Sequence, residues 1–92
     1  MARNLDLTAL RSLVAVAELG GVTRAAGYLN VTQSAVSMQL KRLEESLDIS
    51  LLDRSARTIA LTTAGEQLIG YARQMLALND EAYASSGSAT IE

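Results

Sequence analysis

The sequence predicts a mainly α-helical domain that carries one small β-hairpin. Apolar residues recur at the spacing of a buried helix face, and only the stretch from about residue 49 to 62 departs from that period. Tyrosine is the only aromatic residue type and proline is absent, so the core must be aliphatic, which suits helices packed on helices. The predicted order is helix, helix, tight turn, helix, hairpin and long helix. That order is typical of a winged helix-turn-helix, with three helices and a two-stranded wing, followed by a long C-terminal helix.

The first two predicted helices end at residues that tolerate a left-handed backbone. Residues 7–19 carry one apolar stripe, with Asp6 as the expected N-cap and Gly20-Gly21 as the end. A shorter helix over residues 24–29 should follow, with Thr23 as its N-cap. Asn30 comes next and accepts a positive φ more readily than most residues.

The third predicted helix covers residues 33–47 and has Thr32 as its N-cap. Only Val31 and Thr32 separate Asn30 from this helix, so the second and third helices must be joined by a tight turn. Its predicted buried stripe repeats at spacings of four, three and four residues and consists of Val36, Leu40, Leu43 and Leu47.

A hairpin and a long helix complete the prediction. Short strands are expected at residues 50–54 and 58–62, with 55–57 as the hairpin tip. Thr63 and Glu66 fit a capping box, which predicts a helix over 64–84 with a length of roughly 31 Å. The expected division is a winged helix-turn-helix unit over residues 1–62, a linker or dimerisation helix over 63–85, and a flexible tail over 86–92.

The composition weighs against an enzyme. The chain has no cysteine and no histidine, which excludes thiolate metal sites, disulfides and the commonest metal ligand, so no cofactor is expected. No apolar run approaches the length of a membrane span and the N-terminus lacks a signal-peptide core, so we expect a cytoplasmic protein with no membrane partner. The net charge is −2, but the acidic excess lies in the last third, whereas residues 21–62 hold five cations and four anions.

The third helix has the chemistry of a DNA-reading helix. An α-helix fits the major groove, and the residues at its N-terminus reach base edges. With the apolar stripe turned inward, the other face offers Gln33, which can pair with adenine, Ser34 and Ser37, which can bond to either kind of edge, and Met38, which can touch a thymine methyl. The backbone N–H groups beside Thr32 suit a phosphate.

Five short motifs resemble the LysR-type transcriptional regulators. They lie at residues 23–26, 31–37, 43–44, 51–54 and 61–65, and read TRAA, VTQSAVS, LE, LLDR and LTTAG. The resemblance covers about residues 5–84. Each motif is weak alone, but all five in this order and at this spacing are highly specific. Ser34 departs from the family pattern, which usually has proline there, and Met38 stands where a longer polar side chain is frequent.

The resemblance implies a homodimer that pairs through the long helix and binds a roughly palindromic site on double-stranded DNA. It also implies a separate effector-binding domain, absent from this sequence, through which any small-molecule effector would act. Gln33, Ser34 and Ser37 would face bases, Thr32, Arg42 and Arg54 would serve the phosphate backbone, and Arg57 would lie near the minor groove. The full predicted DNA-binding set is Thr23, Arg24, Thr32, Gln33, Ser34, Ser37, Met38, Lys41, Arg42, Arg54 and Arg57. The predicted dimer interface is Leu68, Ile69, Ala72, Met75, Leu76 and Asn79.

Other interpretations remain open at this point. Lys41 can pair with Glu45 on a solvated helix face, and Arg54 can be a structural partner of Asp53 or Glu44. An all-helical protein-interaction module would explain the acidic pI, but not the arginine at the hairpin tip. An enzyme would have to use carboxylates of the third helix, which have no nearby nucleophile.

Overall fold

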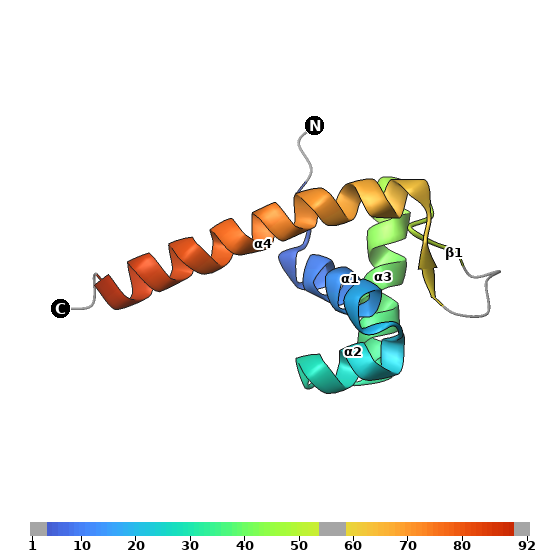
Figure 1. The fold of residues 1–92 in the computed structure, drawn as a ribbon, viewed down its shortest axis with the longest axis horizontal. Helices are drawn as coiled ribbons and strands as arrows, with labels where there is room; N and C mark the ends of the chain where they lie inside the picture. Colours follow the sequence, from blue (N-terminus) through green and yellow to red (C-terminus); the bar gives the residue numbers. More distant parts are fainter. Residues whose placement is uncertain (1–3, 54–58, 90–92) are drawn as a thin grey trace.

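A computed structural model of the chain describes residues 4–53 and 59–89. These residues form four helices and a two-stranded hairpin (Figure 1). In chain order the elements are α1 (Leu7–Leu19), α2 (Val22–Leu29), α3 (Gln33–Leu47), β1 (Leu52–Asp53), β2 (Ala60–Leu61) and α4 (Thr63–Ala89). The predicted fold class is therefore confirmed.

The first helix begins and ends as the sequence predicts, but the second begins earlier. The Asp6 side chain accepts a hydrogen bond from the Thr8 amide, and Gly20 leaves α1 with φ 84°. Helix α2 starts at Val22 with Gly21 as its N-cap, so the prediction that Thr23 caps this helix is wrong. The reason is that the carbonyl of Gly21 already accepts from the amide of Ala25, which places Thr23 inside the first turn.

The turn between α2 and α3 has the predicted form. Asn30 adopts a left-handed conformation with φ 61°, and the Thr32 hydroxyl accepts from the amide of Ala35 at 3.0 Å. The predicted buried stripe of α3 holds for three of its four residues. Leu47 is 39% exposed, because α3 ends directly after it at Asp48 and no other element covers this last turn.

Helix α1 is the centre of the fold. Its Leu10, Leu13 and Val16 side chains are fully buried, and α2, α3 and α4 all pack against it. Helix α3 adds Val36, Leu40 and Leu43 to the same aliphatic core. The core therefore fixes α3 through its buried apolar face and leaves the opposite face of this helix exposed.

The hairpin is shorter than predicted. Leu52 pairs with Leu61 and Asp53 with Ala60 in an antiparallel register. Among the described residues each strand has two paired positions, whereas the sequence predicts five-residue strands whose ends at 54 and 58 lie outside the described residues. The predicted tip, 55–57, lies outside the described residues.

Helix α4 is longer than predicted and is capped by a different threonine. The hydroxyl of Thr62 accepts from the amide of Gly65 at 3.0 Å, so Thr62 caps α4 and Thr63 is its first residue. The helix continues to Ala89, beyond its predicted end at residue 84 and into the segment 86–92 that the sequence predicts as a flexible tail. Its distal half extends away from the body of the domain (Figure 1). None of the described helices combines the length and the apolar character needed to cross a membrane.

Candidate nucleic-acid interface

The start of α3 presents polar side chains to solvent. Gln33, Ser34, Ser37 and Lys41 are exposed, and so is Met38, whereas Val36 and Leu40 in the same turns are buried. The two faces of α3 are therefore chemically distinct, one aliphatic and one polar. The polar face has the composition needed to approach base edges in a major groove.

The first turn of α2 lies beside this surface. Thr23 and Arg24 are both exposed there, and α2 packs on α3. A helix N-terminus carries unpaired N–H groups and a partial positive charge, which favours an anion such as a phosphate. The cation of Arg24 adds to the positive charge at this turn.

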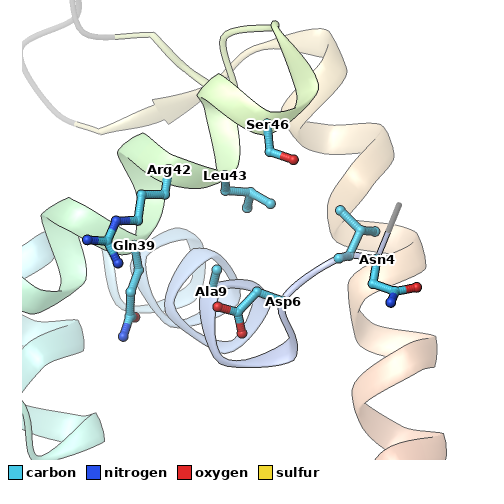
Figure 2. A pocket seen from close by; sticks show the side chains of 8 residues that line it. Asn4, Asp6, Ala9, Gln39, Arg42, Leu43 and Ser46 are labelled. Carbon is cyan, nitrogen blue, oxygen red and sulfur yellow. The ribbon is translucent and has the colours of Figure 1, made fainter. Parts of the chain in front are cut away.

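A shallow gap separates the N-terminal end of α1 from α3. Its volume is about 210 Å³, and Figure 2 shows Ala9 and Leu43 on its two sides with Arg42 at the edge. The Arg42 side chain extends away from Asn4, at the other end of the gap (Figure 2). Arg42 is exposed at this flank of α3.

A wider groove runs between the other flank of α3 and the wing. Ser37 and Lys41 line it on the α3 side, and Leu52 and Ile59 line it on the wing side, with a volume of about 470 Å³. The predicted contacts Arg54 and Arg57 lie outside the described residues. No salt bridge joins Lys41 to Glu45 in the described structure, so Lys41 is available for an external anion.

The described residues do not form a metal site. Nowhere in 4–53 or 59–89 do three carboxylate, histidine or cysteine side chains gather closely enough to hold a metal ion.

The family assignment follows from a match over the whole core of the fold. The sequence pattern described as "Bacterial regulatory helix-turn-helix protein, lysR family" matches residues 7–66, from the start of α1 into α4. This chain belongs to the LysR family. The resemblance inferred from the five motifs is thereby confirmed.

Two relatives illustrate the similarity in sequence. The chain is 50% identical over 82 residues to the HTH-type transcriptional regulator PecT of Dickeya dadantii, which covers 89% of this chain and 26% of PecT. It is 43% identical over 84 residues to the regulator DgdR of Burkholderia cepacia, covering 91% of this chain and 29% of DgdR. The LysR-family chain therefore spans less than a third of these relatives, both of which are named as transcriptional regulators and not as enzymes.

The fold is also that of a solved LysR-family DNA-binding domain. The DNA-binding domain (DBD) of BenM, solved in complex with catB site 1 DNA, superposes on this chain with a TM-score of 0.87 and 33% sequence identity. The match covers 96% of this chain and 99% of that one. The hairpin of this LysR-family domain thus corresponds to the wing of a winged helix-turn-helix.

The predicted dimer residues do not share one environment. Ile69, Ala72 and Leu76 are at most 8% exposed and belong to the core of the same chain. Leu68 and Met75 are partly buried against that core. Asn79 is half-buried and donates a hydrogen bond to Asp80. The sequence shows that α4 has an apolar stripe, but it does not show that α4 lies across α1, and this crossing covers part of the stripe.

Two ion pairs fasten α4 to α1. Arg11 pairs with Asp80, and Arg73 donates from Nε and Nη2 to a carboxylate oxygen of Glu18 at 3.2 and 3.1 Å. The hydrogen bond from Arg11, with a second from Asn79, holds the pKa of Asp80 below its ordinary value of 3.8. The acidic residues of distal α4 lie on the part of the helix that extends away from α2 and the start of α3 (Figure 1).

Sequence analysis missed two residues that organise the site. Glu44 accepts hydrogen bonds from the amides of Leu51 and Leu52, and buried Ser12 donates to Oε1 of Gln39. Glu44 belongs to one of the five motifs and is a candidate partner of Arg54, but neither observation predicts its bonds to the amides of Leu51 and Leu52. The sequence does not predict that Ser12 is buried, because a serine beside apolar helix residues is usually expected to face solvent.

Proposed function

We propose that this domain binds duplex DNA in a sequence-dependent way, with the start of α3 in the major groove. The observation that carries the proposal is the exposure of Gln33, Ser34 and Ser37 on a helix whose opposite face is buried in the core. A helix held in this way can enter a groove without exposing its leucines. The solved BenM domain, which has the same fold, is bound to DNA.

The contacts divide by chemistry. Gln33, Ser34 and Ser37 would read base edges, and Met38 would contact a thymine methyl. The residues proposed for the phosphate backbone are Thr23, Arg24, Thr32, Lys41, Arg42 and Arg54. Arg57 would approach the minor groove from the wing.

We propose that two copies pair through α4. An apolar stripe with the spacing of a coiled coil runs along this helix through Leu68, Tyr71, Met75, Leu78 and Ala82. Tyr71 and Leu78 are 66% and 64% exposed, so these two residues are not used by the chain's own core, although Leu68 and Met75 pack partly against it. This proposed interface keeps Leu68 and Met75 from the interface predicted by sequence. It omits Ile69, Ala72 and Leu76, which belong to the core of the same chain. At 27 residues α4 is about 40 Å long, enough to extend beyond one domain.

The pairing can be tested with two single glutamate substitutions. Leu78→Glu places a charge in the stripe, whereas Ala77→Glu places the same charge on an adjacent exposed position outside it. Analytical ultracentrifugation should show dimers for wild type and Ala77→Glu and monomers for Leu78→Glu. Dimers in all three samples would show that the copies pair through another surface.

A dimer of this kind would read a roughly palindromic site, with half-sites separated by whole turns of the duplex. The test is selection of binding sites from random DNA with the purified chain at low salt, followed by sequencing. Enrichment of a two-fold symmetric sequence is the expected result. Failure to enrich any sequence would contradict sequence-dependent binding, and failure to retain DNA at all would favour a protein-interaction module. The proposed place of action is the cytoplasm, and any small-molecule effector would act through another domain of a longer protein.

A further inference from the structure

One carboxylate oxygen joins α3 to the start of the wing. Oε2 of Glu44 accepts from the amide of Leu51 at 2.8 Å and from the amide of Leu52 at 3.2 Å. Glu44 is half-buried and both leucines are buried. Hydrogen bonds from backbone amides to a partly buried carboxylate are among the stronger ones in proteins.

The same short segment is fastened on its other side to the start of α4. The carbonyl of Leu51 accepts from the amide of Thr62 at 3.0 Å, and the Thr62 hydroxyl donates to the carbonyl of Ser50 at 2.7 Å. The amides of Leu51 and Leu52 therefore face α3, while the carbonyls of Ser50 and Leu51 face Thr62. Residues 50–52 form the junction between the helix that reads DNA, the wing and the long helix.

Among the described residues, the strands of the wing approach α3 at few points other than buried Leu52 and the Glu44 carboxylate. Helices α1 and α2 pack extensively on α3, and α4 packs on β2, but the strands share only sparse contact with α3. Between them lies the groove lined by Ser37, Lys41 and Ile59, to which Glu44 also contributes. The Glu44 carboxylate lines this groove and adds directional bonds to the apolar burial of Leu51 and Leu52.

We propose that Glu44 is a positioning residue for DNA binding, which sets the placement of the wing relative to α3. This inference rests on the proposed function, because the placement matters only if α3 and the wing contact one duplex. Contacts made by two elements of one domain give higher affinity when their separation is fixed before binding, because less conformational freedom is then lost on binding. A wing released from α3 would have to be ordered during binding, and affinity would fall even though the base-reading side chains are intact.

The test compares Glu44→Ala, Glu44→Gln and Glu45→Ala. Glu45 is the exposed neighbour on the same helix, so Glu45→Ala removes the same negative charge and is the matched control. Glutamine keeps a side-chain oxygen at the acceptor position, so Glu44→Gln should preserve the junction without the charge. Each variant is titrated with the selected DNA site and is examined without DNA by amide hydrogen exchange, with thermal unfolding to give the folded fraction.

We expect Glu44→Ala to bind DNA about tenfold more weakly than Glu45→Ala, after correction for the folded fraction. Glu44→Gln should lie within about threefold of wild type, because the acceptor is retained. The preferred base sequence should stay the same in all variants. In the free protein the amides of Leu51 and Leu52 should lose protection in Glu44→Ala and keep it in the other two variants.

Three results would overturn the proposal. Protected Leu51 and Leu52 amides in Glu44→Ala would show that Glu44 does not hold the junction. Equal affinity of Glu44→Ala and Glu45→Ala would show that the junction does not serve DNA binding. A loss in Glu44→Gln as large as in Glu44→Ala would show that charge, not acceptor geometry, is at work. If wild type binds no DNA the proposed function fails, whereas the exchange data still decide whether Glu44 holds the wing to α3.

Discussion

A Cβ atom added at Gly65 would lie 2.2 Å from the carbonyl oxygen of Leu51 and 3.1 Å from Cδ2 of Leu61. The first turn of α4 thus touches the backbone of the residue that leads into the wing. The Leu51 carbonyl cannot move away easily, because it accepts the hydrogen bond from Thr62. Glycine at this position is required by close approach rather than by an unusual backbone angle.

The substitution Gly65→Ala should therefore destabilise the domain by about 1–3 kcal/mol, since the backbone must shift to admit the methyl group. Gly70 lies in the same helix with nothing within 4 Å of an added Cβ. Gly70→Ala should stabilise the domain by about 0.5–1 kcal/mol, because alanine loses less entropy in a helix. Urea unfolding of both variants measures the difference. Changes of the same sign would show that α4 can move away from Leu51 without cost.

The buried hydroxyl of Ser12 should contribute to the α1–α3 contact. Ser12 is almost completely buried, and its Oγ donates to Oε1 of Gln39. Ser12→Ala leaves the Gln39 carbonyl without this donor, and we expect a loss of about 1–2 kcal/mol in unfolding free energy. Ser34→Ala, on the exposed face of α3, should change stability by less than about 0.5 kcal/mol.

A double-mutant cycle with Gln39→Ala separates this bond from the loss of packing. The two substitutions should be less than additive, because each removes the same hydrogen bond. Additive losses would mean that Ser12 and Gln39 stabilise the domain independently of each other.

The Arg11–Asp80 pair should give the domain an acid-sensitive component of stability. The hydrogen bond from Arg11, with a second from Asn79, lowers the pKa of Asp80 in the folded chain. Because the pKa of Asp80 is lower in the folded chain than in the unfolded chain, the ionised carboxylate stabilises the fold at pH values above the ordinary pKa of 3.8. This contribution is lost as the pH falls through the lowered pKa of the folded chain. The stability difference between wild type and Asp80→Asn should therefore shrink as pH is reduced toward that range.

The measurement is urea unfolding of both proteins over a series of pH values, with Glu81→Gln as the control. Glu81 is an exposed carboxylate on the next residue, so this variant loses the same charge and keeps the contact with Arg11. An equal pH dependence in Asp80→Asn and Glu81→Gln would assign the effect to net charge rather than to the ion pair.

Much of the fold follows from local sequence signals. Asp6 and Thr32 cap their helices as predicted, and Gly20 and Asn30 end theirs with a positive φ. These signals act within one turn of chain, so they can be recognised without knowing what packs where. The predicted N-cap of α2, Thr23, is wrong because Gly21 can also begin a helix. The choice between them depends on how the chain leaves α1.

The other differences between prediction and structure concern how the helices and the wing pack against one another. The apolar residues of α4 form two adjacent stripes, and only the packing of α4 across α1 shows that Ile69, Ala72 and Leu76 face inward. The role of Glu44 depends on where residues 50–52 return to α3. Such roles depend on tertiary contacts, which cannot be predicted from the spacing of residues along one helix.

Base readout by α3 should depend on Gln33. It is exposed in the first turn of α3, where a side chain reaches base edges. Gln33→Ala should cost about 1–3 kcal/mol in binding to the preferred site, because a bidentate contact to a base is lost. Affinity for random DNA should change little. An equal loss on both DNAs, measured by fluorescence anisotropy, would assign Gln33 to the backbone instead.

Lys41 should contribute to affinity without contributing to sequence preference. It is exposed at the edge of the groove between α3 and the wing, and no salt bridge to Glu45 competes for it in the described structure. A lysine that contacts phosphate releases counterions, so Lys41→Ala should flatten the dependence of log affinity on log salt by about one unit per half-site. Lys41→Arg keeps the charge and should keep the slope. The slope is measured by titrating the selected site and a scrambled site at several salt concentrations. A loss confined to the selected site, with an unchanged slope, would place Lys41 on a base rather than on a phosphate.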